Sequence, residues 1–278
     1  MSKPLAVDLF CGLGGWTEGL LAEGYHVIGY DIERHEYGEN RYPGELVVAD
    51  VLTLHGSQFK DAALIVASPP CQEYSYMAMP WKKAKAKAAA IRADTSGAEL
   101  ERLNRLFNAC FRIQKEASIA AGRHVPLIVE NVRGAIPWVG RSRWNFGSFH
   151  LWGDVPALMP VAFKAQKVPG FRFDGSGGSF QTASVAETGV KAPGMNWSDP
   201  TKRGQDFTRL AGKHAVDHAS GTKIGGDWFS DPNSTCRKHG SKSPQRKAAS
   251  AMIAKIPEPL ARHIAVTFRL DAQSRPAA

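Results

Sequence analysis

The side chain with the clearest chemical potential is Cys71, which follows two prolines in the run SPPCQ at residues 68–72. Two consecutive prolines stiffen the backbone and restrict the direction of the side chain that follows them. The thiolate is the nucleophilic form of cysteine, and a cysteine at the end of a strand can present its sulfur to a cleft. The alternative is a buried structural thiol, the usual fate of a free cysteine.

A carboxylate and two guanidinium groups follow this cysteine along the chain. Glu130 stands in the run ENV at residues 130–132, directly after an apolar segment, where a carboxylate could take part in proton transfer. A Glu-Asn pair that caps a helix is the alternative. Arg141 and Arg143 are two residues apart, so their side chains share one face if the segment is extended, although an ordinary surface strand shows the same spacing.

A glycine-rich run, DLFCGLGG, occupies residues 8–15, between an apolar segment and a helical pattern. Glycines at such a junction permit a tight turn and let a ligand approach the backbone amides at the start of a helix. Asp31 and Asp50 end the next two apolar segments, where Asp31 could accept hydrogen bonds from ribose hydroxyls and Asp50 from an adenine amino group. Each carboxylate alone is more often a helix cap or a solvated charge, but the three segments in this order favour an adenosine-containing cofactor.

Short apolar runs separated by turn residues alternate with helical patterns in the first half of the chain. The runs are residues 5–10, 26–30, 46–49, 63–67 and 126–129. Continuous apolar strands are typical of a parallel sheet that is buried on both faces. Residues 97–122 carry apolar side chains at helical spacing between two glycines, which predicts one long amphipathic helix. The alternation predicts an α/β fold with a doubly wound, Rossmann-like domain.

The composition changes after Trp152, which suggests three parts of the chain. Residues 1–152 form the predicted α/β domain. Residues 153–245 are rich in glycine, serine, proline and threonine and show little periodicity, which predicts a smaller, loop-rich domain. Residues 246–278 are helical again, and we expect this C-terminal helix to return to the first domain.

The protein is basic overall. Its 278 residues are 43% hydrophobic, and 35 Lys and Arg stand against 26 Asp and Glu, for a formal net charge of +9. This charge favours a polyanionic partner, because basic side chains that neutralise phosphates release condensed counterions. No apolar run approaches the ~20 residues that span a bilayer, and the first residues do not resemble a signal peptide. We therefore expect a cytoplasmic protein without membrane contact, and four cysteines without paired spacing argue against a disulfide framework.

Two further clusters have weaker implications. The first could ligate zinc and consists of His214, His218, Cys236 and His239. The spacing between Cys236 and His239 is not a familiar zinc-finger pattern, so we predict no metal. Several lysines follow the cysteine run, and either a solvated helix face or a phosphate-binding surface would explain them; they are Lys82, Lys83, Lys85 and Lys87.

The glycine-rich run, PCQ at residues 70–72, ENV at residues 130–132 and Arg141-Ser142-Arg143 occur in this order on successive segments. The set resembles the bacterial or phage-type DNA (cytosine-5-)-methyltransferase family, whose members carry an FxGxG cofactor loop, a PCQ nucleophile loop, an ENV motif and an RxR motif. The resemblance covers residues 1–152. The sequence departs from the family in two places. After PCQ the family usually has any one residue followed by Phe-Ser, whereas this chain has Glu73-Tyr74-Ser75. The family's late Gly-Asn-Ser-like motif is not evident.

The resemblance implies S-adenosylmethionine as the cofactor. It assigns these residues to cofactor binding: Asp8, Phe10, Gly12, Gly14, Gly15, Asp31, Asp50 and Pro70. Within the set we expect Phe10 to pack on the adenine, Asp31 to bind the ribose and Asp50 to bind the adenine edge.

The resemblance also implies a covalent mechanism on a base that is flipped out of the duplex stack. The Cys71 thiolate would add to C6 of cytosine, and Glu130 would protonate or hydrogen-bond N3. Arg143, together with Arg141, would hold O2 and the reacting edge. C5 would then take the methyl group, lose its proton and expel the sulfur.

The expected partner is duplex DNA, with residues 153–245 reading the bases in the major groove. We expect a monomer in the cytoplasm of a bacterial or phage-infected cell, with a role in restriction-modification. Methylation of RNA of the tRNA type is one alternative, because some relatives with the same core act on tRNA. A catalytically degenerate DNA-binding module is another, against which the intact Cys71, Glu130 and Arg143 argue. An adenine amino-methyltransferase is disfavoured, since such sites need an aromatic residue where Cys71 stands.

Overall fold

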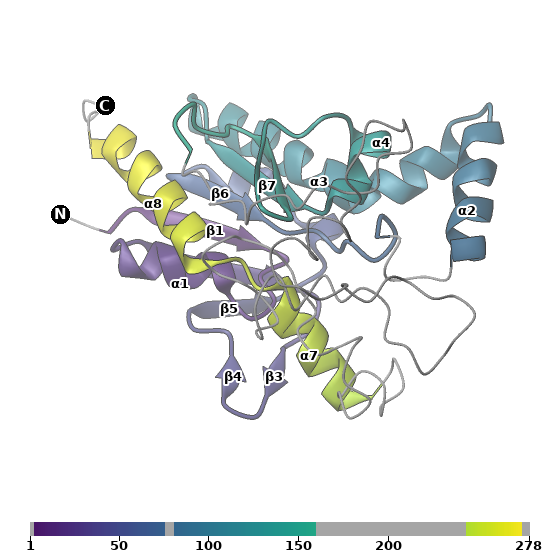
Figure 1. The fold of residues 1–278 in the computed structure, drawn as a ribbon. Helices are drawn as coiled ribbons and strands as arrows, with labels where there is room; N and C mark the ends of the chain where they lie inside the picture. Colours follow the sequence, from purple (N-terminus) through teal and green to yellow (C-terminus); the bar gives the residue numbers. More distant parts are fainter. Residues whose placement is uncertain (1–2, 76–80, 160–242, 274–278) are drawn as a thin grey trace, which may run out of the picture. The chain divides into compact units, whose positions relative to one another are not determined.

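A computed structural model describes residues 3–75, 81–159 and 243–273 (Figure 1). The chain divides into two compact units, Met1–Val161 with Ala254–Ala278, and Ala162–Ile253. The second unit includes all but the last residue of helix α7 (Pro244–Ala254), and the other elements named below belong to the first. Most of the expected loop-rich domain lies outside the described residues, as do His214, His218, Cys236 and His239 of the candidate zinc set.

The first unit is built on a seven-stranded sheet with the order β5-β2-β1-β6-β7-β9-β8. The strands are β1 (Leu5–Leu9), β2 (His26–Asp31), β5 (Glu45–Val48), β6 (Leu64–Ala67), β7 (Leu127–Asn131), β8 (Trp144–Phe146) and β9 (Phe149–Gly153). The first five in this order are parallel, and β9 and β8 continue the sheet as an antiparallel hairpin. A separate short hairpin joins β3 (Glu36–Tyr37) to β4 (Asn40–Arg41).

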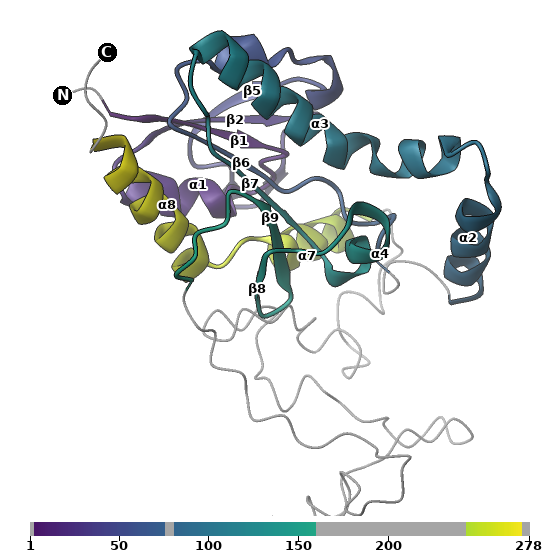
Figure 2. The ribbon, with the colours of Figure 1, turned by 90° about the horizontal axis from the view of Figure 1, so that it is seen from above.

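Helices cover both faces of the sheet, which confirms the predicted doubly wound α/β fold (Figures 1 and 2). The α-helices of this unit are α1 (Gly15–Ala22), α2 (Trp81–Ala93), α3 (Ala98–Ala121), α4 (Ile136–Val139) and α8 (Glu258–Gln273), and the short 3₁₀ helices are η1 (Val51–Thr53), η2 (Gly56–Phe59) and η4 (Arg133–Ala135). Val7 and Leu9 of β1 point into the core on the α3 side, where they cluster with Phe107. Asp8, between them, points to the opposite face and is hydrogen-bonded to Thr17 of α1.

The predicted elements agree with the structure at nearly every boundary. Each of the five apolar runs forms a parallel strand within two residues of its expected ends, and α3 begins after Gly97 and ends before Gly122. The β8–β9 hairpin was not predicted. Gly147, with φ 57°, and Ser148 separate its strands, and a glycine-containing two-residue connection between apolar runs is a hairpin signal. None of the helices in the described ranges is long and apolar enough to cross a membrane.

Helix α8, near the C-terminus, packs closely on α1, near the N-terminus. A Cβ atom added to Gly19 of α1 would lie 2.5 Å from the Ala261 Cβ and 2.7 Å from backbone atoms of α8. Salt bridges flank this contact, from Glu18 to Lys255 at 2.5 Å and from Glu23 to Arg262 at 2.7 Å. Because partly exposed ion pairs contribute little, close packing at the glycine is the main constraint on this helix pair.

We predict that Gly19→Ala lowers the free energy of unfolding by about 1–3 kcal/mol, the usual cost of overpacking a close contact. Helix propensity alone predicts the opposite, since alanine stabilises a helix interior by ~1 kcal/mol relative to glycine. Urea unfolding followed by circular dichroism measures the difference. Equal or greater stability in the variant would contradict the close α1–α8 contact.

Candidate active site at the carboxyl edge of the sheet

The parallel strands end level with one another. Leu9 at the end of β1 is in register with Tyr30 of β2 on one side and with Ala67 of β6 on the other, and Ala67 is in register with Val129 of β7. The chain leaves β1 toward β2 and later returns to the other side of β1 to form β6. Ligands of doubly wound proteins bind outside the carboxyl ends of the strands at such a reversal. The segments that follow β1 and β6 therefore meet where a binding site is expected.

The loop after β1 is held against β2 by backbone and carboxylate contacts. The Cys11 amide donates to the Tyr30 carbonyl at 3.2 Å, and the Gly12 amide donates to the Asp31 Oδ2 at 2.9 Å. Phe10 has φ 57°, in the left-handed region that bulky residues rarely adopt, which stores backbone strain at the start of the loop. The loop conformation thus depends on Asp31, one of the two predicted ribose- and adenine-binding carboxylates.

Glycine is suited to each of these positions in the loop for a different structural reason. Gly12 has φ 51°, and a Cβ added to it would have no atom of the described residues within 4 Å, so this position faces open space in that part of the chain. A Cβ on Gly14 would lie 2.4 Å from the Pro43 Cδ, and one on Gly15 would lie 2.4 Å from the Ile256 amide nitrogen. The expectation that these glycines leave room for a ligand therefore fits the geometry at Gly12, whereas Gly14 and Gly15 leave room for the protein itself.

The carboxylate at the end of β2 and the one just after β5 both bind backbone amides. Asp31 also lies 3.4 Å from the His35 Nε2, and Asp50 accepts a hydrogen bond from the Leu52 amide at 2.9 Å as the cap of η1. Burial alone would raise the pKa of Asp31, but the hydrogen bonds from His35 and from the Gly12 amide outweigh it and lower that pKa. Asp31 is therefore an ionised acceptor at neutral pH. A hollow beside it is lined by Arg34, His35, Glu36, Arg41, Tyr42, Gly44 and Leu46.

Asp8 lies inside the protein, beneath the loop. Its side chain is 1% exposed, its Oδ2 accepts from the Thr17 hydroxyl at 2.7 Å, and that hydroxyl also lies 2.7 Å from the Tyr42 hydroxyl. The Asp8 Oδ1 is buried and has no hydrogen-bond partner among the described residues. Burial raises the pKa of Asp8 to about 7, with a smaller contribution from the negative charge of Asp31. This geometry makes Asp8 a support for the loop.

Cys71 begins a compact turn after β6. Its carbonyl accepts hydrogen bonds from the amides of Tyr74 at 3.0 Å and Ser75 at 2.9 Å. Of the three cysteines in the described ranges, Cys11 and Cys110 are buried and Cys71 is half-buried. Burial raises the pKa of the Cys11 and Cys110 thiols, which keeps both protonated and inert. Cys71 is thus the cysteine of this part of the chain that a solute can reach most readily.

Neighbouring elements hold the segment before Cys71. The Trp16 Nε1 of α1 donates to the Ser68 Oγ at 3.0 Å, and the Asn131 Nδ2 of β7 donates to the Pro69 carbonyl at 2.9 Å. The Asn131 Oδ1 also accepts from the Val132 amide at 2.8 Å. Asn131 therefore binds the PCQ segment and its own ENV segment with the same side chain, which brings these two predicted motifs together.

Glu130 lies within the sheet, and the arginine pair lies just before its last strand, β8. Glu130 is 4% exposed. It is the second-last residue of β7, which ends at Asn131. It is in register with Leu151 of β9, whose carbonyl accepts from the Arg143 amide at 2.8 Å. The side chains of Arg141 and Arg143 are exposed, and both residues precede β8. The structure thus places Arg143 and Glu130 on either side of one strand.

The sequence patterns did not identify the polar residues that form hydrogen bonds with these motifs. Thr17 and Tyr42 bind the buried Asp8, yet Tyr42 lies 25 residues from Thr17 and belongs to no recognised motif. Trp16, which binds Ser68 52 residues away, was also missed. A hydrogen bond between distant segments leaves no periodic signal in one sequence, so spacing offered no way to find them.

Comparison with known proteins gives one family match. Residues 5–136 match the family model described as C-5 cytosine-specific DNA methylase. No curated protein sequence matches the chain.

Three solved structures that resemble parts or all of this chain are described as methyltransferases. One is described as a DNA modification methyltransferase encoded within a prophage (E. coli), with 22% identity, 48% of this chain and 33% of that chain covered, and a TM-score of 0.32. The Entamoeba histolytica methyltransferase EhMeth has 17% identity, coverage of 50% and 41%, and a TM-score of 0.32. The S. pombe Dnmt2 methyltransferase has 11% identity, coverage of 99% and 100%, and a TM-score of 0.43. The chain spans less than half the length of the first two.

The buried Asp8 predicts a pH dependence of stability. The folded protein retains the Asp8 proton up to pH about 7, whereas the unfolded chain loses it near pH 4, so unfolding becomes easier as pH rises between these values. From pH 5 to pH 7 the wild type should lose about 2–3 kcal/mol relative to Asp8→Asn, which has no proton to release. Urea unfolding of both proteins at several pH values measures this difference. A difference that does not change with pH would show that Asp8 is ionised in the folded state.

Proposed function

Residues 5–136 belong to the C-5 cytosine-specific DNA methylase family, and on this basis we propose that the protein methylates C5 of cytosine in duplex DNA through a covalent bond between Cys71 and C6. The observation that carries the proposal is the contact between the Asn131 side chain and the Pro69 carbonyl. It joins the segment that presents Cys71 to the strand that carries Glu130. A thiol nucleophile and a carboxylic acid are the two groups that addition to a cytosine ring requires.

The loop after β1 fits S-adenosylmethionine, the methyl donor on which this family depends. Gly12 has a left-handed conformation three residues before α1 begins, and a Cβ added to it would meet no atom of the described residues within 4 Å, which leaves room for a ligand near the amides at the start of the helix. Asp31 is an ionised acceptor next to Gly12, suited to ribose hydroxyls, and Asp50 offers a second carboxylate after the neighbouring strand. When bound, the cofactor supplies an electrophilic methyl group.

The remaining residues of the set contribute shape and support in this proposal. Phe10 is half-buried against the core and would pack on the adenine, and Pro70 would approach the cofactor from the β6 side. Asp8 would act from the interior by holding α1 through Thr17, and Gly14 and Gly15 by allowing the loop to pack closely.

Cys71 begins the reaction after losing its proton to solvent, and a sulfur lone pair forms the bond to C6. The C5=C6 electron pair moves toward C4 and the C4=N3 pair moves onto N3, which takes a proton from Glu130 and leaves C5 as the nucleophilic carbon of an enamine. The C4=C5 electron pair then forms the bond to the methyl carbon, with the donor sulfur as the leaving group, and the N3 proton returns to Glu130 as the C4=N3 pair is restored. Loss of the C5 proton to solvent restores the C5=C6 pair and expels Cys71 as a thiolate. Because Glu130 is buried, its proton transfer takes place away from bulk water.

The arginines and the loop-rich segment would bind the rest of the substrate. Arg143 and Arg141 are exposed next to the strand that pairs with Glu130, where a guanidinium could hold the O2 of a flipped base. Residues 153–245 would form the recognition domain, between a catalytic domain of residues 1–152 and a C-terminal part of residues 246–278. The net charge of +9 and the separate unit Ala162–Ile253 support this division and a nucleic-acid partner.

The test is methyl transfer to unmodified DNA that contains all short sequence contexts. PCR-amplified DNA of several kilobases and an RNA transcript of the same sequence are each incubated with the protein and S-adenosylmethionine. Mass spectrometry of the hydrolysed nucleosides should detect 5-methyl-2′-deoxycytidine from the DNA and no methylcytidine from the RNA. Glu130→Gln should lower the turnover at least ~10²-fold with little change in DNA affinity, because glutamine cannot supply the N3 proton.

Glu101→Gln is the matched control, since Glu101 is exposed on α3 and the same substitution there should leave turnover unchanged. Methylcytidine in the RNA alone would identify an RNA enzyme. DNA binding without a methylated product would indicate a degenerate binding module, and wild-type turnover in Glu130→Gln would remove Glu130 from the mechanism.

A further inference from the structure

The residues just after Cys71 differ from the related motif, and one of them connects the turn to the core. Tyr74 stands where the family usually has phenylalanine, and its side chain is 4% exposed. Its hydroxyl donates to the Asn104 Oδ1 of α3 at 2.9 Å, with the Leu103 carbonyl of α3 at 3.3 Å as a second acceptor. Phenylalanine has no hydroxyl and could not make either bond.

Asn104 continues this connection to the segment that follows Glu130. It is 7% exposed, and its Nδ2 donates to the Trp138 carbonyl of α4 at 2.8 Å. Burial raises the pKa of Tyr74, so its hydroxyl stays protonated and remains a donor. Both polar groups of the Asn104 side chain are therefore satisfied in a buried site, where hydrogen bonds are strong and loss of a partner is costly.

A second contact brings the same two segments together. A Cβ added to Gly134 would lie 2.2 Å from the Tyr74 carbonyl oxygen, so only glycine allows the chain after β7 to approach the turn this closely. On the other side of Cys71, the Asn131 side chain binds the Pro69 carbonyl. Contacts therefore hold the turn on both sides of Cys71, at Pro69 two residues before it and at Tyr74 three residues after it.

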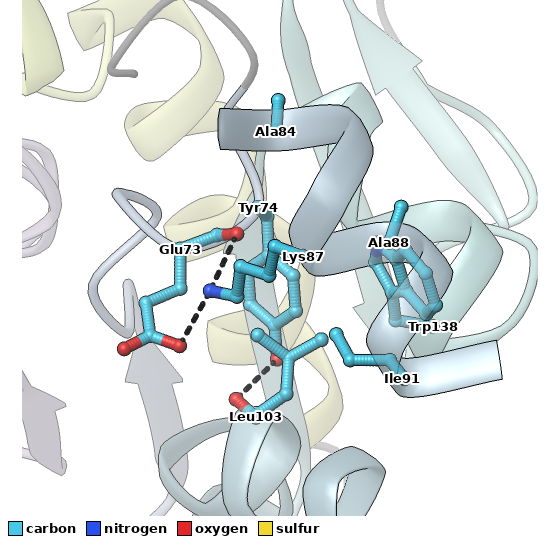
Figure 3. Close-up of a pocket in the computed structure, with 8 residues that line it drawn as sticks. All are labelled: Glu73, Tyr74, Ala84, Lys87, Ala88, Ile91, Leu103 and Trp138. Carbon is cyan, nitrogen blue, oxygen red and sulfur yellow. Dashed lines mark hydrogen bonds and ion pairs between the residues drawn. The ribbon is translucent and has the colours of Figure 1, made fainter. Parts of the chain in front are cut away.

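The exposed contacts of the turn are weaker than this buried one. Figure 3 shows the salt bridge between Glu73 and Lys87 of α2. Its Nζ–Oε2 distance is 2.7 Å, and the side chain of Glu73 is 52% exposed. Solvent screens such a pair, whereas the Tyr74 ring extends from the turn to the α3 backbone at Leu103, beneath α2 (Figure 3). The buried hydroxyl is therefore the contact that best defines where the turn lies.

We propose that Tyr74 and Asn104 are positioning residues, which hold the Cys71 turn in the orientation that attack on the base requires. This inference rests on the proposed function, in which the Cys71 Sγ must reach C6 of a flipped cytosine. Attack requires the reacting atoms about 3–3.5 Å apart and aligned, and a displacement of about 1 Å can cost ~10²-fold in rate. Without the hydroxyl, the ring can stay packed while the turn samples other positions.

The test compares Tyr74→Phe with Tyr25→Phe. Tyr25 is also buried, and its hydroxyl donates to the Ala265 carbonyl of α8 at 3.0 Å, on the other face of the sheet from α3. Both variants lose one buried hydroxyl, so both should lose similar stability in urea. Single-turnover methyl transfer to the PCR-amplified DNA, at saturating S-adenosylmethionine and DNA, should fall at least ~10-fold in Tyr74→Phe alone, with the KM for both substrates unchanged. The rate of Cys71 alkylation by iodoacetamide, measured by peptide mass spectrometry without DNA, should also change in Tyr74→Phe alone.

Equal single-turnover and alkylation rates in Tyr74→Phe and the wild type would overturn the inference and leave the proposed function intact. Equal losses in Tyr74→Phe and Tyr25→Phe would also overturn it, because they would indicate a general effect of stability. A wild-type protein that methylates neither DNA nor RNA would instead contradict the proposed function, and the inference with it.

Discussion

The register of the parallel strands is the constraint on which the site depends. Because β2, β1, β6 and β7 end level with one another, segments separated by up to 120 residues emerge at one edge of the sheet. The apolar strands and α3 form the core that maintains this register, since a slip of one residue would turn every buried side chain to the opposite face. The loop after β1, the Cys71 turn and the Glu130 segment inherit their relative positions from that pairing.

Side chains that bind backbone groups then define each segment. Asp31 holds the Gly12 amide, and Asn131 holds the Pro69 carbonyl, so side chains join β2 to the loop after β1 and β7 to the segment after β6. The strained Phe10 lies at the end of β1, together with the buried Asp8 Oδ1, which has no hydrogen-bond partner among the residues that the structure describes. Strain and unsatisfied polar atoms reduce stability and persist only where the surrounding structure over-determines them. Their concentration at one strand end fits a segment whose conformation serves binding.

The sequence predicted the features that have a local signal. The parallel strands are uninterrupted apolar runs, and α3 combines helical spacing with glycines at both ends, so burial and helix-capping rules identified them. Residue type and position after an apolar run point to Cys71 and Glu130, and the structure joins their segments through Asn131, although their catalytic roles stay predictions. The reasons for Gly15 and Asp8 could not be predicted, because Gly15 packs against Ile256, far along the chain, and the Asp8 carboxylate lies inside the fold.

The central claim, that Cys71 forms a covalent bond to cytosine C6, can be tested without knowledge of the target sequence. DNA is amplified with 5-fluoro-2′-deoxycytidine triphosphate in place of the natural nucleotide, so that every cytosine on the new strands carries fluorine at C5. Fluorine cannot leave C5 as a cation, and the adduct should remain after methyl transfer. With S-adenosylmethionine, the wild type should give a protein–DNA complex that survives denaturing electrophoresis, with the nucleotide on the Cys71 peptide, and Cys71→Ser should give none. Methylation of ordinary DNA without any trapped complex, or a complex that persists in Cys71→Ser, would contradict the account.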